Sequence, residues 1–179
     1  MKGFARREFQ LMLLRRMADF QPDLVRAACE ELDATHAEYM AAHNRWQTML
    51  RSRRAPAGLD LYQAVLGPPE TSRDVAVGDA TTTVCTWRLP GLWPDLRWQA
   101  VVGFNRVVLD AGLVRDPDSV RPDLPPPDRL APWSCVIADA LAAYPDARQH
   151  DPDVPTQWLL LVGPAELWFV HGLLQTVRS

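Results

Sequence analysis

Two histidines, His36 and His43, are the first residues to consider for chemistry, and they lie in a long stretch without proline or glycine. On a helix, residues seven apart are separated by two turns, about 10 Å along the axis. Zinc-binding helices place their two histidines four apart, so this spacing does not predict a metal site. No cofactor is expected. The remaining chemical hypothesis is a small enzyme or ligand-binding protein with a pocket between helix and sheet that uses His36, His43 or His171.

A cysteine near the start of a predicted helix, Cys135, is the second candidate. A helix N-terminus can lower the pKa of a thiol, and Asp139 follows one turn later, with His171 in the last predicted strand. A cysteine in an alanine-rich amphipathic helix is more often a packing residue than a nucleophile. The sequence also lacks the nucleophile-elbow, dinucleotide-binding and P-loop motifs. Whether the chain is an enzyme stays open, and the balance is against it.

Arginines supply the third group of candidates. Residues 1–54 hold ten Lys and Arg against seven Asp and Glu, whereas residues 55–179 hold nine against fifteen. A nucleic-acid-binding alternative would use seven of the arginines in the amino-terminal part, namely Arg6, Arg7, Arg15, Arg16, Arg51, Arg53 and Arg54. The overall net charge of −3 and the acidic residues among them favour solvated helix faces instead.

The elements that would position these residues begin with a helical hairpin over 1–54. Its first helix covers about residues 4–20, and a break at Pro22 opens a second, uninterrupted helix to about Arg53. In that helix a seam recurs at alternating spacings of three and four, typical of a coiled coil. At 1.5 Å per residue the second helix would be about 45 Å long and would extend beyond the first. Its exposed end, with Tyr39, Trp46 and Met49, would bind a partner, and we therefore expect a homodimer.

Alternating apolar residues predict strands over 81–89, 96–103 and 106–115. In the third of these, Val107, Leu109, Ala111 and Leu113 are expected to face inward. Short helices are predicted over 59–66 and 132–144, and the segment 70–80 is predicted to be a polar loop. A stiff, acidic, proline-rich connector covers 116–131.

A repeated framework, W-x3-V-G-x8-G-L, begins at Trp98 and again at Trp158. It places Gly103 opposite Gly163 in hairpin turns and Gly112 opposite Gly172 as mid-strand kinks. The segment 164–178 suits either a helix or a strand on local evidence, and the repeat favours the strand.

Together these elements predict an α+β protein with one antiparallel sheet of about five strands, in the order β-β-β-α-β-β, packed on helices. We expect a single domain over 1–179, with the helical hairpin at 1–54 and the sheet with its inserted helix at 70–179. The element order is similar to that of the small secretion-chaperone-like fold, which is often dimeric, but fold likeness does not transfer function.

Composition is ordinary for a globular protein, with 47% hydrophobic and 23% charged residues. Three unpaired-looking cysteines, no signal peptide and no apolar run of membrane-spanning length predict a cytoplasmic protein, and the Arg, Ala and Pro bias suggests a bacterial source. Aromatic residues expected at the surface, Trp93 and Trp168, join Tyr39, Trp46 and Met49 as binding candidates. The leading hypothesis is a non-catalytic, chaperone-like or scaffold protein that binds a protein partner.

Overall fold

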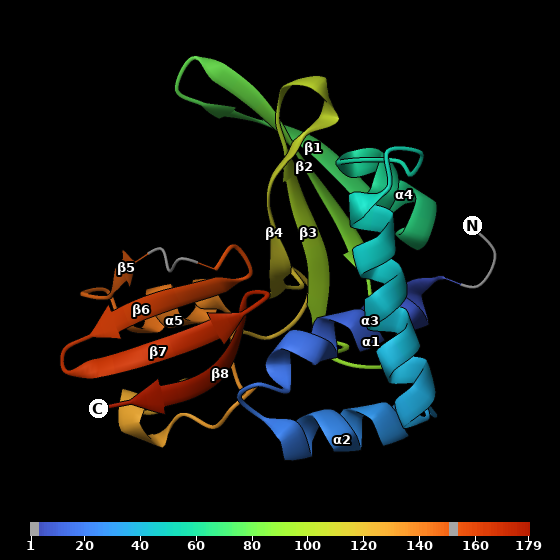
Figure 1. Cartoon of the computed structure of the whole chain (residues 1–179). Coiled ribbons are helices and arrows are strands. Elements are labelled where there is room, and N and C mark those ends of the chain that lie inside the picture. The colour runs from blue at the N-terminus through green and yellow to red at the C-terminus, as the bar shows by residue number, and fades with distance from the viewer. Residues whose placement is uncertain (1–3, 151–153) are drawn as a thin grey trace. The chain divides into compact units, whose positions relative to one another are not determined.

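The computed structural model describes residues 4–150 and 154–179, which form two compact units, Met1–Ala111 and Gly112–Ser179. Each unit contains helices and one four-stranded antiparallel sheet, so the chain is α+β, as predicted (Figure 1). The prediction of one sheet of about five strands is wrong, and so is the predicted order of elements. Each unit is compact by itself, and the single domain over 1–179 stays a prediction.

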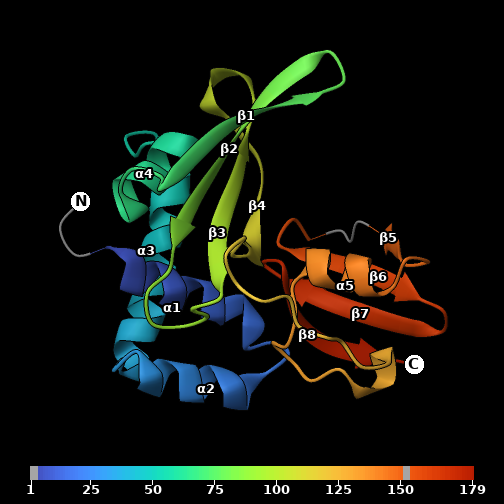
Figure 2. The same ribbon diagram turned by 180° about the vertical axis from the view of Figure 1, so that it is seen from behind.

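The first unit places its helices on one side of its sheet (Figures 1 and 2). Its helices are α1 (Arg6–Met17), α2 (Pro22–Glu31), α3 (His36–Arg51) and α4 (Leu59–Leu66). Its strands are β1 (Thr71–Val77), β2 (Ala80–Arg88), β3 (Leu96–Val102) and β4 (Val108–Arg115), in that spatial order, and β4 continues into the second unit.

An aromatic cluster forms the core between these helices and the sheet. Phe9 of α1 is fully buried and meets Trp98 of β3 edge to face, with ring centroids 5.0 Å apart. Phe9 also contacts Trp46 of α3 and Tyr62 of α4 at 5.5 and 6.0 Å. Trp87 pairs directly across from Trp98 and donates its indole N–H to the Gly67 carbonyl. One phenylalanine therefore joins three helices to the sheet.

The single long helix predicted from Pro22 to about Arg53 is wrong, because the chain breaks between α2 and α3. Asp33 adopts a left-handed conformation, with φ of 49°, and Thr35 begins a new helix as its N-cap. The Thr35 hydroxyl accepts from the Glu38 backbone N–H, while the Glu38 carboxylate accepts from the Thr35 N–H at 2.9 Å. This reciprocal capping box stabilises a helix start inside what the sequence suggests is a continuous seam.

Loss of this cap gives a testable stability effect. Replacing Thr35 with alanine is expected to lower the free energy of unfolding by about 1 kcal/mol, measured by urea denaturation. The hydrogen bonds from the Thr35 backbone and hydroxyl, with help from Arg7, lower the pKa of Glu38 below its usual 4.5. The stabilisation linked to this shift is fully present above the usual pKa and is lost as the pH falls through the folded-state pKa. The difference between the wild type and Thr35→Ala should therefore shrink on acidification. A difference that grows on acidification would contradict the assigned cap.

The first sheet also contains a strand that the sequence did not predict. Strand β1 pairs with β2 from Thr71 opposite Thr86 to Val77 opposite Ala80, where a polar loop was expected. All of its residues are exposed except the half-buried Val75, so it lacks the apolar face that marks a strand in a sequence. Its pairing with β2 is what makes it a strand.

The second unit packs the helix α5 on one face of its sheet (Figure 2). Its regular elements are η2 (Pro127–Arg129), α5 (Ile137–Ala143), β5 (Arg148–His150), β6 (Gln157–Val162), β7 (Ala165–Val170) and β8 (Leu173–Arg178). The strands are ordered β5-β6-β7-β8. Leu160, Leu167, Phe169 and Leu174 are fully buried with Cys135 and Ala140 in its core. The helix predicted over 132–144 begins only at Ile137, because Trp133 has a left-handed φ of 63°.

The repeated framework marks related hairpins, with one difference. Gly103 and Gly163 lie in the turns after β3 and β6, and the segment 164–178 is strand, as predicted. Gly172, however, lies between β7 and β8 rather than inside a strand, and its φ is 83°. A Cβ there would lie 2.5 Å from the carbonyl oxygen of Leu113, so only glycine fits this close approach. The second copy thus contributes two hairpins instead of one.

Among the described residues, no helix has both the length and the apolar character needed to cross a membrane.

Candidate functional site

The candidate histidines are divided between the two units, with His36 and His43 in the first and His171 in the second. His36 is exposed at the start of α3 and His43 is half-buried two turns later, whereas His171 is buried in the second unit. Burial, together with the charges of Arg15 and Arg16, lowers the pKa of His43. Across the described residues, no three His, Cys, Asp or Glu side chains are grouped to hold a metal ion.

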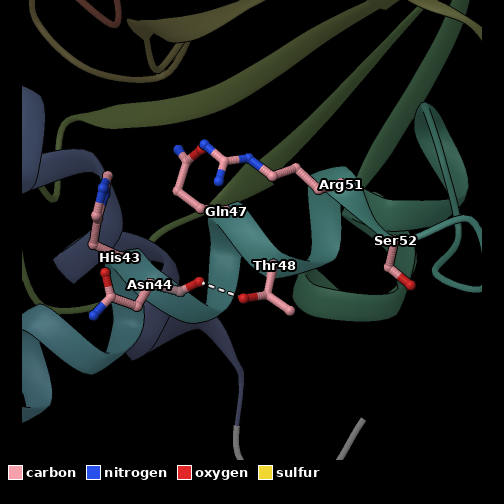
Figure 3. Close-up of a pocket in the computed structure, with 6 residues that line it drawn as sticks. All are labelled: His43, Asn44, Gln47, Thr48, Arg51 and Ser52. Carbon is pink, nitrogen blue, oxygen red and sulfur yellow. Dashed lines mark hydrogen bonds between the residues drawn. The ribbon is translucent and has the colours of Figure 1, made fainter.

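His43 lies in a cleft of about 620 Å³ along α3. The cleft is lined by His43, Asn44, Gln47, Thr48, Arg51 and Ser52, all from one helix and the residue after it. His43, Gln47 and Arg51 point to the same side of the helix, and Thr48 donates to the Asn44 carbonyl (Figure 3). The residues described there supply an imidazole, two amides, two hydroxyls and a guanidinium but no carboxylate.

Cys135 is a core residue in this structure. Its side chain is fully buried, and burial, followed by the charge of Asp139, raises the pKa of the Cys135 thiol to about 12. A thiol in this state is neither deprotonated at neutral pH nor open to a substrate. The environment is therefore the opposite of the lowered pKa that a cysteine nucleophile requires.

This environment predicts slow thiol labelling. At pH 8 in the native protein, we expect a soluble disulfide reagent to modify Cys29, which is half-buried, and to leave Cys85 and Cys135 unmodified. All three thiols should react once the chain is unfolded in denaturant. In Cys29→Ser, native labelling should disappear. Rapid native labelling of Cys135 in that variant would support a cysteine nucleophile.

The candidate arginines separate into paired and unpaired groups. Four of them contact carboxylates: Arg6 contacts Glu70, Arg7 contacts Glu8 and Glu38, and Arg15 and Arg16 contact Asp19. Arg7 also donates to the carbonyls of Leu32 and Asp33, which ties α1 to the break before α3. Arg51, Arg53 and Arg54 are exposed at the end of α3, and no described carboxylate pairs with them. We refer to these three residues as the basic end of α3.

The aromatic binding candidates are mostly part of the core. Tyr39, Trp46 and Met49 are each at most 8% exposed, so the predicted overhang does not exist and these side chains offer little surface to a partner. Trp168 is half-buried, stacks under the Arg178 guanidinium at 5.2 Å and donates to Glu166. Trp93 is half-buried in a turn with φ of 53°.

The strongest candidate site is instead the β3–β4 tip, which comprises the turn 103–107 and Leu109 at the start of β4. Phe104 is 86% exposed, and Val107 and Leu109 are 53% and 62% exposed. The predicted inward orientation of Val107 and Leu109 is wrong. The side chain of Leu109 packs over the Gly103 backbone, where a Cβ would meet it at 2.9 Å. We refer to these three exposed apolar residues, Phe104, Val107 and Leu109, as the apolar ridge of the tip.

The backbone of this tip is strained and anchored. Asn105 and Arg106 both adopt left-handed conformations, with φ of 54° and 61°, and the Val107 N–H donates to the Phe104 carbonyl. This is a type I′ turn, which usually has glycine where Arg106 stands. Arg106 donates to Asp60 at 2.6 and 2.9 Å and to Gln63 at 2.8 Å, so α4 holds the turn in place. Strained backbone that its surroundings fix in this way is common at binding sites.

The sequence predicted a turn at Phe104 and Asn105 but not its role. The sequence feature that could have revealed the site is Phe104 itself, because a large aromatic side chain in a tight turn has no core to pack into. The tip also lies at the same end of the sheet as the β1–β2 turn, where Val77 is 59% exposed (Figure 1). Because Thr83 pairs with Val102, the last residue of β3, the β1–β2 ribbon extends beyond β3 at this end.

Comparisons with known proteins add little. No family model and no curated protein matches this sequence. A crystal structure from Streptococcus mutans, of a protein named "putative beta-lactamase inhibitor protein", is similar over 72% of this chain and 85% of that chain, with 13% identity and a TM-score of 0.30. A likeness this weak carries no argument about fold or function.

Proposed function

We propose that this chain is a non-catalytic protein-interaction module that binds a protein partner through the β3–β4 tip. The observation that carries the proposal is the 86% exposure of Phe104 on a turn that α4 holds rigid. Burying a phenylalanine side chain contributes about 1.5–3 kcal/mol. Because Arg106 ties the turn to α4, the backbone of the turn should lose little conformational entropy on binding.

The other hypotheses have less support. The α3 cleft with His43 supports a histidine-containing pocket, but its described lining comes from a single helix and the residue after it and contains no carboxylate. The Thr48 hydroxyl in this lining donates to the Asn44 carbonyl. Only the basic end of α3 still supports nucleic-acid binding, because the other candidate arginines contact carboxylates. Both hypotheses, and the expected homodimer, stay predictions.

The proposal is tested by placing a photo-crosslinking residue at the tip. In cells that naturally express the chain, Phe104→p-benzoylphenylalanine should yield a discrete crosslinked protein after irradiation. The same residue at Val120, which is 90% exposed in the second unit, serves as the control and should not yield that product. A crosslinked second copy of the chain would instead assign the tip to a homodimer.

Binding of the identified protein should then depend on Phe104. With both proteins purified, Phe104→Ala is expected to weaken the affinity about 30-fold or more, the effect of losing an interface residue worth about 2 kcal/mol. Unchanged affinity in Phe104→Ala, or identical crosslinking from positions 104 and 120, would contradict the proposal. Because the side chain is exposed, its loss should leave the stability intact.

A further inference from the structure

The surroundings of the β3–β4 tip indicate the chemistry of its partner. The loop after α3 returns to the tip at Gly58, where a Cβ would collide with the Arg106 carbonyl oxygen. Gly58 also has a left-handed φ of 56°, so glycine is suited to this close approach. The basic end of α3 is therefore linked to the tip through a short, packed connection.

Chain geometry places the nearest of these arginines close to the tip. Arg54 precedes Gly58 by four residues, which span at most about 14 Å even when fully extended. Leu50, which is 55% exposed on the last turn of α3, adds apolar surface beside the same arginines.

The charge at this end of the first unit is not balanced. Arg106 is paired with Asp60, whereas Arg51, Arg53 and Arg54 have no described carboxylate partner. Two exposed acidic residues also lie at this end of the sheet, namely Asp110, which follows Leu109, and Asp79 in the β1–β2 turn. Arg51 and Arg53 precede Arg54 by no more than three residues, so this end of the unit carries three exposed arginines without a described carboxylate partner against the two aspartates. An acidic partner would complement this excess of positive charge.

We propose that the β3–β4 tip and the basic end of α3 together bind a protein segment that carries apolar side chains flanked by carboxylates. This inference rests on the proposed function. The apolar residues of the partner would cover Phe104, Val107 and Leu109, and its carboxylates would face Arg51, Arg53 and Arg54. Two of the three ridge residues are aliphatic and cannot stack on bases, which favours a protein partner over a single-stranded nucleic acid.

The test is a selection of a displayed library of random peptides against the full chain. The peptides that lose binding to Phe104→Ala are sequenced and compared with the unselected library. We expect them to be enriched in Asp and Glu together with Leu, Ile, Phe or Trp. For a synthetic peptide from this set, Arg54→Glu should weaken binding about three- to ten-fold, mainly through slower association that depends on salt.

Arg26→Glu is the matched control, because it makes the same charge change at an exposed arginine of α2 in the same unit. It should leave peptide binding within about two-fold of wild type. Phe104-dependent peptides without acidic enrichment, or equal effects of Arg54→Glu and Arg26→Glu, would overturn this inference but not the proposed function. A selection that yields no Phe104-dependent peptide would overturn both.

Two further measurements test the other possible ligands of this surface, a single-stranded nucleic acid and a second copy of the chain. A labelled single-stranded oligonucleotide should not bind at low salt, and binding that both Phe104→Ala and Arg54→Glu weaken would reassign the surface to nucleic acid. Sedimentation of the wild-type chain should show no self-association that depends on these two residues. Such self-association would assign the surface to a second copy and overturn the acidic-segment inference.

Discussion

Replacing Phe9 with alanine is expected to lower the free energy of unfolding of the first unit by about 3–5 kcal/mol. Phe9 is fully buried and contacts Trp46, Tyr62 and Trp98. Its removal would leave a cavity between three helices and the sheet, because these elements cannot all close around an alanine. Urea denaturation followed by tryptophan fluorescence measures the change, since the cluster contains tryptophans.

Phe104→Ala is the matched control for Phe9→Ala, because both variants remove the same side chain from the same unit. Phe104 is 86% exposed, so its loss should change the stability by no more than about 0.5 kcal/mol. The two variants should therefore show opposite profiles, with Phe9→Ala impairing folding and Phe104→Ala impairing only binding. Equal losses of stability would contradict the placement of Phe9 in the core and Phe104 at the surface.

Replacing Asp139 with alanine is the second change with a large expected effect, about 3–5 kcal/mol in the second unit. Asp139 is 1% exposed and accepts hydrogen bonds from Arg115 at 2.7 and 3.2 Å and from the Val136 N–H at 3.1 Å. The change would leave the largely buried Arg115 guanidinium without its carboxylate. It would also remove the capping interaction at the start of α5.

Two further variants separate the contributions to this effect. Asp139→Asn retains an oxygen for the Val136 N–H but loses the charge, so its stability should be intermediate. Arg115→Met in the Asp139→Ala background removes the unpaired charge and should recover part of the loss. Asp146→Ala, at an exposed position, is the control and should be nearly neutral. An Asp139→Ala variant as stable as Asp146→Ala would contradict the assigned ion pair.

Local sequence patterns correctly predicted the strands in which apolar and polar residues alternate and the helix that glycines border. Helix α4 runs from Leu59 to Leu66 as predicted, because a glycine borders it on each side. The predicted inward residues of β3, which are Leu96, Trp98, Ala100 and Val102, are all buried. The strands on both sides of Gly163 follow from the match with the first hairpin. In each of these cases, neighbouring residues carry enough information to determine the local structure.

The errors arose where interactions beyond a few residues decide the structure. The apparent seam from Val25 to Met49 is divided by the capping box of Thr35 and Glu38, and Arg7 of α1 stabilises the break through the Leu32 and Asp33 carbonyls. Strand β1 has no apolar face and exists through its pairing with β2. Helical periodicity and strand alternation do not report such contacts.

The candidate site also depends partly on local sequence and partly on contacts between distant elements. The sequence by itself determined that the chain is α+β, that a turn follows Val102 and that no common catalytic motif is present. Only the tertiary structure showed that Tyr39, Trp46 and Met49 belong to the core, and that Arg106 is held by α4 with Phe104 left exposed. The physical reason is that the exposure of a side chain depends on which distant elements pack against it, and residue type alone does not determine that packing.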